Sequence, residues 1–488
     1  MNKFKLYVVL LAIWNVILFY GNSYGISVIL FIIPLLIYLY RILKYNKKIN
    51  NKKGLLLMIP IIMLSLTYFI FNNEEFKALN FIVIIGLIAL MYIITIKDTY
   101  EFKTLFEDMF ITIFEPITLL GDFFKEMFPK RKNKIKVSDK TKRVLKSILI
   151  ALPLVVIVLL LLSSADMIFG NIFTKFFSLF KFKLELDLFW KIVGRVISFV
   201  FVMTLLGTSC MFISKSYGEK KEEIVKPDTK KDLLSLKIIF IALNIIYVIF
   251  DFIQIKSLML HSISMSGITY AEYARQGFFQ LMFVSIINIT LILISKKFEN
   301  NSNKKEFNLI KIMSVIMMAL TVVIVISSFL RMNLYESVYG YTVLRLLVYI
   351  TLITELILMI PTIIYIFNSK FNIVKSYMVI IIVVYIITNY MNIDYVIAKR
   401  NIDRYYENGK IDVDYLMNYN TDNVSLLIDL FNNIDSSEKK DDLNNYFYYM
   451  RDDLKDQNIF EYNISKSKAY DKIKNLKIKE PEYRNFYD

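Results

Sequence analysis

The chain has 488 residues, of which 56% are hydrophobic and 15% aromatic, and its mean hydropathy is +0.50. This composition is too apolar for a soluble protein of this length and indicates a multi-pass membrane protein. The net charge of +16 resides in the apolar part, because residues 393–488 hold 19 acidic and 15 basic side chains. Basic charge that follows the apolar part is typical of membrane topology and argues against a nucleic-acid partner.

The cysteine and histidine content excludes several kinds of site. The one cysteine, Cys210, cannot form an intramolecular disulfide, and the one histidine, His261, excludes sites that need several imidazoles. The sequence contains no phosphate-binding glycine loop, no HExxH and no paired CxxC motif, so we expect no cofactor and no metal. Abundant Ile, Lys, Asn and Tyr are typical of AT-rich coding in bacteria.

Apolar stretches long enough for a membrane helix, which needs about 20 residues, recur along the chain. The eleven stretches are residues 5–22, 25–43, 54–71, 77–96, 145–163, 190–213, 233–255, 277–295, 309–330, 342–367 and 374–392. The segment "YGNSYG" after the first stretch lacks a small-residue cleavage pattern, so this stretch is expected to be an anchor and not a signal peptide. We therefore expect an all-α polytopic transmembrane bundle followed by a small soluble all-α domain. Its parts are a four-span region (1–96), a loop (97–146), a seven-span core (147–392) and the helical domain (393–488).

The distribution of lysine and arginine predicts the orientation. With the N-terminus inside, the five inner connections hold 29 of these residues and the five outer connections hold 7. This excess predicts a cytoplasmic N-terminus and cytoplasmic loops at 97–146 and 214–232. An odd number of spans then places residues 393–488 outside the plasma membrane. Three basic residues soon after the last span, Lys399, Arg400 and Arg404, favour the other side, which an even number of spans would give.

The loop 97–146 combines an amphipathic segment with a basic one. Apolar side chains at helical spacing predict a helix along the inner membrane interface. These side chains are Phe102, Leu105, Phe106, Met109, Phe110, Ile113 and Phe114. The segment from Lys130 to Lys146 has nine basic residues and one acid. It serves either as a binding site for anionic lipid headgroups or as a positive-inside stop signal.

Polar side chains at the outer ends of the apolar stretches form the candidate site. We expect an outer-leaflet cluster of Asp166, Arg195, Asp251, Gln254, Glu272, Arg275, Gln276, Gln280, Arg331, Glu336, Arg345 and Asp394. Helical spacing places Glu272, Gln276 and Gln280 on one stripe, with Arg275 beside them. The same spacing places Asn244, Tyr247, Asp251 and Gln254 on one face of the seventh stretch. Only Glu355 lies deeper, near the middle of the tenth stretch.

Several roles are open for this cluster. Its charges either pair between helices, which would be purely structural, or they bind a polar external ligand, or they catalyse a reaction. The leading hypothesis is a non-enzymatic receptor, regulator or scaffold that binds an envelope component or a partner protein. An enzyme acting on a lipid-linked or headgroup substrate at the outer face, with Asp166 and Glu272 as acid and base, is the first alternative. A transporter is the second, although glycine, with 13 of 488 residues, is scarce for such a fold.

Four segments resemble a known family. They are "SSADMIF", "YAEYARQGFFQL", "FLRMNLYESVYGYTVLR" and "NIDYVIAKRNIDRYYENGKIDVDYL", and they are similar to segments of the bacterial multi-pass membrane proteins of the domain-of-unknown-function 4173 family. The resemblance extends from about Ser163 to Leu430. It implies a membrane fold with a trailing helical domain, and it brings no activity, substrate or catalytic residue.

The predicted topology can be tested with single cysteines in a Cys210→Ala background. An impermeant thiol reagent applied to intact cells should label Ser437→Cys and leave Ser138→Cys and Ser216→Cys unlabelled, because only the first position is expected outside. Labelling of Ser138→Cys together with protection of Ser437→Cys would contradict the orientation. Permeabilised cells, in which all three variants should react, control for buried thiols.

Overall fold

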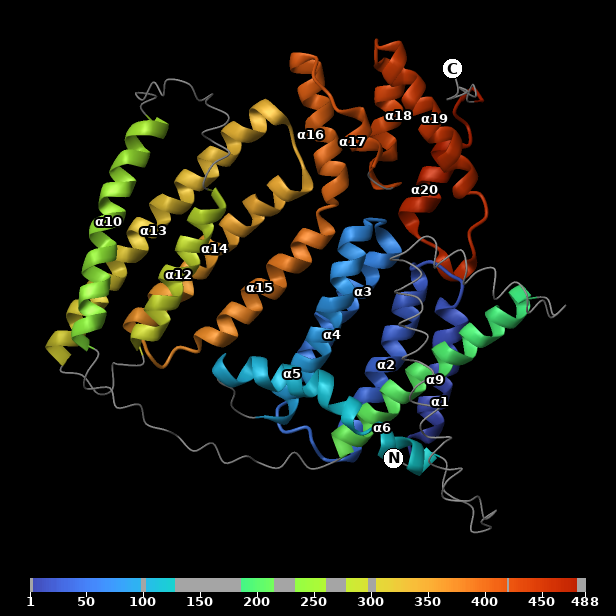
Figure 1. Cartoon of the computed structure of the whole chain (residues 1–488), viewed down its shortest axis with the longest axis horizontal. Coiled ribbons are helices and arrows are strands. Elements are labelled where there is room, and N and C mark those ends of the chain that lie inside the picture. The colour runs from blue at the N-terminus through green and yellow to red at the C-terminus, as the bar shows by residue number, and fades with distance from the viewer. Residues whose placement is uncertain are drawn as a thin grey trace, which may run out of the picture. The chain divides into compact units, whose positions relative to one another are not determined.

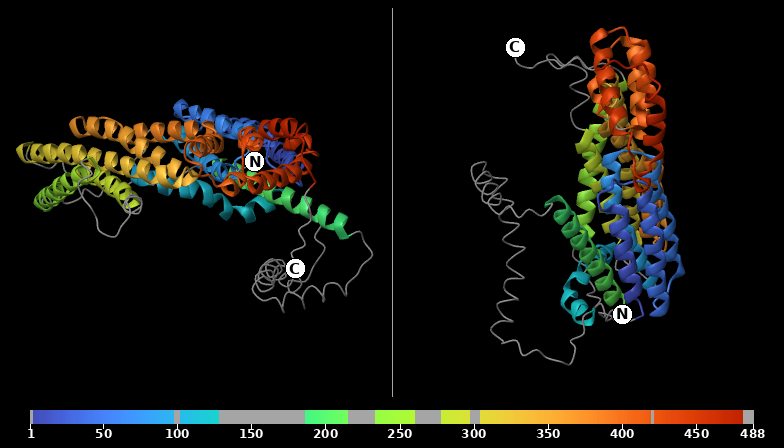
Figure 2. Two further views of the ribbon diagram at one scale, coloured as in Figure 1. Left: turned by 90° about the horizontal axis from the view of Figure 1, so that it is seen from above. Right: turned by 90° about the vertical axis from the view of Figure 1, so that its right-hand side faces the viewer.

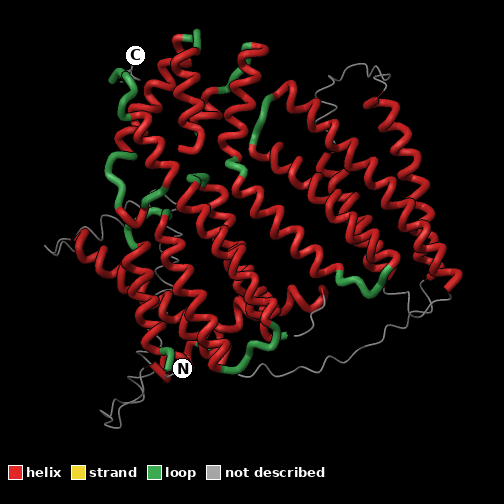
Figure 3. Tube along the Cα trace, turned by 180° about the vertical axis from the view of Figure 1, so that it is seen from behind, coloured by secondary structure: helices red, strands yellow, loops and turns green. Residues whose placement is uncertain are grey.

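The computed structural model describes residues 3–97, 102–127, 186–214, 233–259, 278–296, 304–418 and 421–480. Within these ranges the regular elements are helices and none is a strand (Figure 1 and Figure 3), so the all-α prediction is confirmed. The chain divides into two compact units. Unit 1 comprises Met1–Gly21, Tyr38–Asn46 and Phe114–Ser216, and unit 2 comprises Asn22–Ile37, Lys47–Ile113 and Tyr217–Asp488.

Eight of the described helices are long and apolar enough to cross a membrane. They are α2 (Ile26–Tyr45), η1 (Lys52–Leu57) continued by α3 (Met58–Ile70), α4 (Glu74–Ile96), α9 (Leu186–Ser214), α10 (Leu233–Met259), α13 (Lys304–Tyr339), α14 (Val343–Phe367) and α15 (Ile373–Tyr390). Two shorter apolar helices, α1 (Lys5–Phe19) and α12 (Phe278–Ser295), lie at two further predicted spans. The predicted span at 145–163 lies outside the described residues, so the count of eleven stays a prediction.

Unit 1 is built on the packing of α1 against α9. Gly207 of α9 lies against the ring of Phe123 from α6 (Leu120–Met127), which is fully buried. A Cβ at position 207 would come within 2.7 Å of Cζ of that ring, so only glycine permits this contact. Tyr38, at the end of α2, donates a hydrogen bond of 2.9 Å to the carbonyl of Leu206 and so joins α2 to α9.

In unit 2, α10, α12, α13 and α14 lie side by side around a shared apolar core (Figure 1). Phe240, Ile292, Met317 and Leu352 are buried where these helices meet. The opposite faces carry large exposed apolar side chains such as Phe252. An apolar outer face is what a helix needs when its surroundings are lipid, so the burial pattern agrees with a membrane bundle. On the other side, α14 contacts α15, and α15 contacts α3.

The C-terminal helices of unit 2 form a core of their own, and we call them the C-terminal bundle. They are α16 (Ile393–Asn408), α17 (Val413–Met417), η4 (Thr421–Asn423), α18 (Val424–Asn433), α19 (Ser437–Asp453), η5 (Ile459–Glu461) and α20 (Ile464–Ile473). An Asn-Gly pair at 408–409 favours a turn, and Gly409 ends α16 in the left-handed conformation with φ of 73°. The Ser436 side chain caps α19 by accepting from the backbone N–H of Lys439.

The C-terminal bundle binds the loop between α13 and α14. The Asn401 side chain accepts a hydrogen bond of 3.0 Å from the backbone N–H of Tyr341 and donates one of 2.9 Å to its carbonyl. Arg404 donates to the carbonyl of Val338 at 2.6 Å. The end of α13 and the start of α14 therefore face the bundle.

Two further loops face the bundle in the same way. The Asn463 amide donates hydrogen bonds of 2.8 Å to the carbonyls of Tyr68 and Phe71, at the end of α3. The backbone N–H of Ile26, at the start of α2, donates to the carbonyl of Tyr462 at 3.0 Å. Figure 2 shows, in its right-hand view, the C-terminal bundle at one end of α3 and α4. The loops 22–25, 71–73 and 340–342 thus lie on one side of the membrane helices of unit 2.

The expected amphipathic helix is present as α5 (Phe102–Thr118), followed after a break at Leu119 by α6. Phe106 and Phe110 are 64% and 65% exposed, whereas Asp108 is buried and forms an ion pair of 2.6 Å with Lys97. An exposed aromatic stripe is what a helix at a membrane interface presents to the lipid. The side of the membrane on which it lies stays a prediction.

Alanine at Gly25 should weaken the attachment of the C-terminal bundle. A Cβ there would lie 2.6 Å from the carbonyl carbon of Glu461 and 2.7 Å from the carbonyl oxygen of Tyr462, and backbone atoms cannot move out of its way singly. We expect Gly25→Ala to lower the free energy of unfolding in detergent by about 1–3 kcal/mol. Gly121→Ala is the control, because a Cβ there meets nothing within 4 Å. Equal thermal midpoints for the two variants would contradict the assignment.

Candidate functional site

The polar face predicted on the seventh apolar stretch is confirmed on α10. Asn244, Tyr247, Asp251 and Gln254 are all buried, while Ile249 and its apolar neighbours are exposed. Asn244 donates to the carbonyl of Met313 at 3.1 Å, and Tyr247 donates to Asn288 at 2.7 Å. Neither carboxylate oxygen of Asp251 has a hydrogen-bond partner in the part of the chain that the structure describes.

The structure brings some of the predicted cluster residues together. Arg331 of α13 donates to the side-chain oxygen of Gln254 at 2.8 Å. One turn further, Glu336 accepts a hydrogen bond of 2.9 Å from the hydroxyl of Tyr349. The guanidinium of Arg345 lies 4.4 Å from the ring centroid of Tyr335 and donates to the carbonyl of Gly340.

The other predicted residues fall elsewhere. In unit 1 the guanidinium of Arg195 lies 5.5 Å from the centroid of the Tyr20 ring. Gln280 is exposed near the start of α12. Asp394, on α16, belongs to a different set of contacts, described below. Four members of the predicted cluster lie outside the described residues: Asp166, Glu272, Arg275 and Gln276.

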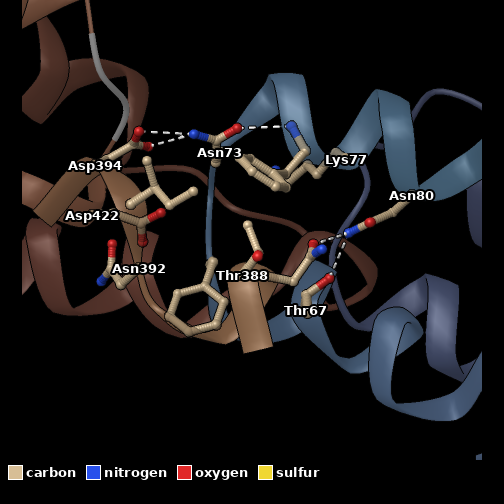
Figure 4. Close-up of a pocket in the computed structure, with 12 residues that line it drawn as sticks. Thr67, Asn73, Lys77, Asn80, Thr388, Asn392, Asp394 and Asp422 are labelled. Carbon is tan, nitrogen blue, oxygen red and sulfur yellow. Dashed lines mark hydrogen bonds between the residues drawn. The ribbon is translucent and has the colours of Figure 1, made fainter. Parts of the chain in front are cut away.

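A polar pocket lies where α3, α4 and α15 meet the C-terminal bundle, and we call it the junction pocket (Figure 4). The cavity is small, with a volume of about 20 Å³, which is close to the room that one water molecule needs. Its lining residues are Thr67, Phe71, Asn73, Phe76, Lys77, Asn80, Thr388, Asn389, Asn392, Ile393, Asp394 and Asp422. Of the twelve cluster residues predicted from the sequence, the lining includes only Asp394.

Two helix caps position the carboxyl group of Asp394. Asn73 caps α4 by accepting from the backbone N–H of Phe76 at 2.8 Å. Its amide nitrogen then donates to both carboxyl oxygens of Asp394, at 2.8 and 2.9 Å. Asn392, in the left-handed conformation with φ of 49°, caps α16 and places Asp394 in the first turn. Asparagine tolerates this backbone conformation better than most residues, which explains its use at the turn.

Amide and amine groups on the next turns of α4 extend the network. Asn80 donates to Thr67 of α3 at 3.0 Å and to Asn389 of α15 at 2.7 Å. Lys77 is buried and donates to Asn72 at 2.6 Å and to Glu74 at 2.8 Å. Three helices are therefore joined below the pocket by hydrogen bonds between side chains.

Burial controls the protonation of the pocket carboxyl groups. Asp394 is 1% exposed, and burial raises the pKa of its carboxyl group to about 7, although the hydrogen bonds from Asn73 act in the opposite direction. Burial also raises the pKa of Asp422, while bonds from Ser465 and the backbone of Asn72 oppose the change. In the part of the chain that the structure describes, Asp394 forms no ion pair.

A second pocket adjoins the first and is larger, with a cavity volume of about 220 Å³. It shares Phe71, Asn392 and Asp422 with the junction pocket, and it adds the hydroxyl groups of Thr421, Ser425 and Ser465. The two pockets together present carboxyl, amide and hydroxyl groups beside aromatic rings. This set of groups is suited to binding a polar ligand by hydrogen bonds and charge.

The sequence contains a signal for the junction pocket that lies outside the predicted polar cluster. Asn73, Lys77 and Asn80 recur at intervals of four and three, so they share one face at the start of an otherwise apolar helix. Asp422 carried no such signal, because it lies in a short polar turn. The described residues contain no group of three His, Cys, Asp or Glu side chains that would hold a metal ion.

Comparison with known proteins finds one family. A family model described as "Domain of unknown function (DUF4153)" matches residues 58–430, about three quarters of the chain. No curated protein and no solved structure matches it. The match supports an uncharacterised family, and the expected 4173 family is not confirmed.

Asp394→Asn should change how stability depends on pH. In the folded protein the pKa of Asp394 is about 7, above its ordinary value of 3.8, so between these values the folded chain keeps a proton that the unfolded chain loses. The stability associated with that proton is complete below pH 3.8 and is lost as the pH rises through about 7. The difference between these two pKa values corresponds to a free energy of unfolding of about 4 kcal/mol.

Thermal unfolding between about pH 5 and about pH 8 measures this difference. Asp394→Asn, which stays neutral, should gain stability relative to the wild type as the pH rises. Asp403→Asn, at an exposed position of the same helix, is the control and should follow the wild type. Parallel profiles for the wild type and Asp394→Asn would contradict the assignment.

Proposed function

The chain belongs to the family of the domain of unknown function DUF4153, and from its junction pocket we propose that it is a non-enzymatic membrane receptor or scaffold that binds an ammonium-bearing envelope component. The observation that carries this proposal is the carboxyl group of Asp394. It is buried in a polar pocket, accepts hydrogen bonds from an amide and has no cation beside it among the described residues. A cationic ligand group would supply the missing charge.

The remaining pocket groups suit the same ligand. Asp422 offers a second carboxyl group, and Asn392 lines both pockets. The rings of Phe71 and Phe76 line the pocket as well, and an ammonium group is attracted to the face of an aromatic ring. Lys77 is already bonded to Asn72 and Glu74, so its positive charge is directed away from Asp394.

The contacts of the C-terminal bundle support an external position for the pocket. The bundle contacts loops 22–25, 71–73 and 340–342, which the excess of lysine and arginine in the other loops predicts to be outside. We propose that residues 393–488 form an external domain on the plasma membrane of a bacterium, with the N-terminus in the cytoplasm.

The same contacts support eleven spans. The end of α4 and the start of α13 both lie on the side away from the C-terminal bundle, so an even number of crossings must separate them. Helices α9, α10 and α12 supply three, and the predicted span at 145–163 would be the fourth. On the cytoplasmic side we propose that the segment from Lys130 to Lys146 binds anionic lipid headgroups.

One observation favours an enzyme as the second candidate. A carboxyl group whose pKa is about 7 suits general acid–base catalysis at neutral pH, and Asp394 has that value. The hydroxyl groups of the junction pocket, however, already donate to helix carbonyls: Thr67 to Leu64 and Thr388 to Val384. No activated nucleophile therefore accompanies Asp394 in this pocket, and binding is the better-supported function.

Ethanolamine tests the proposal, with ethylene glycol as the matched probe that keeps a hydroxyl group and lacks the ammonium group. At about pH 8, where Asp394 is ionised, ethanolamine should raise the thermal midpoint of the protein in detergent. A ligand at ten times its Kd stabilises the folded state by about 1.4 kcal/mol. The double variant Asp394→Asn/Asp422→Asn should fold and show no such increase. An equal response to both probes, or an unchanged response in the double variant, would overturn the proposal.

A further inference from the structure

A layer of polar side chains crosses the bundle of α10, α12, α13 and α14 in unit 2. Ser285 and Asn288 of α12, Thr321 of α13 and Glu355 of α14 are all buried, and the first three have no exposed surface. Polar groups at such positions need partners within the protein, because lipid offers none. Each hydroxyl group has one hydrogen to donate, and this limits the hydrogen bonds that the layer can form.

One branch of the layer is complete. Tyr247 donates to the side-chain oxygen of Asn288 at 2.7 Å, and the Asn288 amide donates to the hydroxyl oxygen of Thr321 at 2.9 Å. The Thr321 hydroxyl then donates to the carbonyl of Met317 at 2.6 Å. Each hydroxyl hydrogen is used once, and all groups in this branch are neutral.

The other branch is one hydrogen short. The hydroxyl oxygen of Ser285 lies 2.8 Å from the carbonyl of Met282 and 2.5 Å from Oε2 of Glu355. A serine hydroxyl has one hydrogen to donate, and a backbone carbonyl only accepts. Both contacts are satisfied together only when the carboxyl group of Glu355 carries a proton and shares it with Ser285.

The surroundings of Glu355 agree with a neutral group. Its other oxygen, Oε1, is buried and has no hydrogen-bond partner. Among the described residues, no ion pair involves Glu355. An unpaired carboxylate in such a place is costly, whereas a carboxylic acid is not.

Several titratable and charged groups on the helices packed against α14 bond to partners other than Glu355. On α13, Arg331 bonds Gln254 and Glu336 bonds Tyr349. At the end of α12, Lys296 donates to the carbonyl of Ile366 at 3.0 Å. On α15, Tyr377 shares a hydrogen bond with Thr362.

We propose that Glu355 is a proton-binding site within the membrane, and that loss of its proton breaks the contact between α12 and α14. The deprotonated carboxylate would have no counter-charge, and it could accept the serine hydrogen only if Ser285 gave up its bond to Met282, so the contact between the two helices would open or admit water. Proton binding is thereby coupled to helix packing, as a proton-coupled membrane protein requires. This site is independent of the junction pocket and of the function proposed for it.

Glu336 is the matched control, because it is buried to the same extent on the neighbouring helix. It differs from Glu355 in that the hydroxyl group beside it has a hydrogen to donate. Tyr349 donates its hydroxyl hydrogen to Oε2 of Glu336, so this contact needs no proton on the carboxyl group, whereas Oε1 of Glu336 is buried without a partner, as it is in Glu355. N,N′-Dicyclohexylcarbodiimide adds to protonated carboxyl groups in apolar surroundings and forms a stable acylurea. At neutral pH we expect the modified peptide to contain Glu355 and not Glu336.

The labelling is read by peptide mass in the wild type, Glu355→Gln and Glu336→Gln. Loss of the label in Glu355→Gln and its retention in Glu336→Gln are expected. Absence of label at Glu355 in the wild type would overturn the proposal. Protection of Glu355 by sodium chloride, relative to choline chloride, would also overturn it, because the site would then bind a metal cation as a carboxylate.

Stability provides a second measurement. Glu355→Gln keeps a donor for Ser285, so its thermal midpoint at neutral pH should remain near that of the wild type. Ser285→Ala should lower the midpoint more than Ser314→Ala, which removes an equally buried hydroxyl group that bonds only its own helix. A marked increase in the midpoint of Glu355→Gln would show that the wild type buries an ionised group, and this would overturn the proposal.

Discussion

A polar side chain on a membrane helix must find its hydrogen-bonding partner inside the protein, because hydrocarbon supplies none. In unit 2 many serine and threonine hydroxyl groups bond to carbonyls of their own helix, whereas amide side chains bond between helices. Asn288 joins α10 to α13, and Asn80 joins α3 to α15. Each amide offers donors and an acceptor in fixed geometry, so these residues determine the register in which the helices pack.

The same constraint gives the buried carboxyl groups different chemistry. Asp394 accepts two hydrogen bonds from one amide, Glu336 accepts one from a tyrosine, and Glu355 contacts a serine whose hydrogen is already used. Burial favours the neutral form of a carboxyl group, and donors that reach its oxygens oppose this effect. The hydrogen bonds around each carboxyl group therefore differ in how far they support its charged form.

The junction pocket lies where the C-terminal bundle is attached by hydrogen bonds to loops as well as by direct helix contacts. Asn463 and Asn401 bind backbone groups of two different loops, and such bonds leave space between the elements that they connect. Polar side chains from α4 and α16 line that space. A junction of this kind can change when a ligand enters, because hydrogen bonds to loops are individually weak and are replaceable by bonds to the ligand.

The sequence by itself determined the helical class, the positions of the apolar helices, the polar face of α10 and the Asn-Gly turn after α16. These features follow from periodicity, stretch length and local backbone preference, all of which depend on neighbouring residues. Only the tertiary structure decided that Asn73 holds Asp394, 321 residues away, and that Ser285 meets Glu355. Spacing along a helix shows which face is polar. It cannot show which other helix that face meets, because this depends on how all the helices pack together.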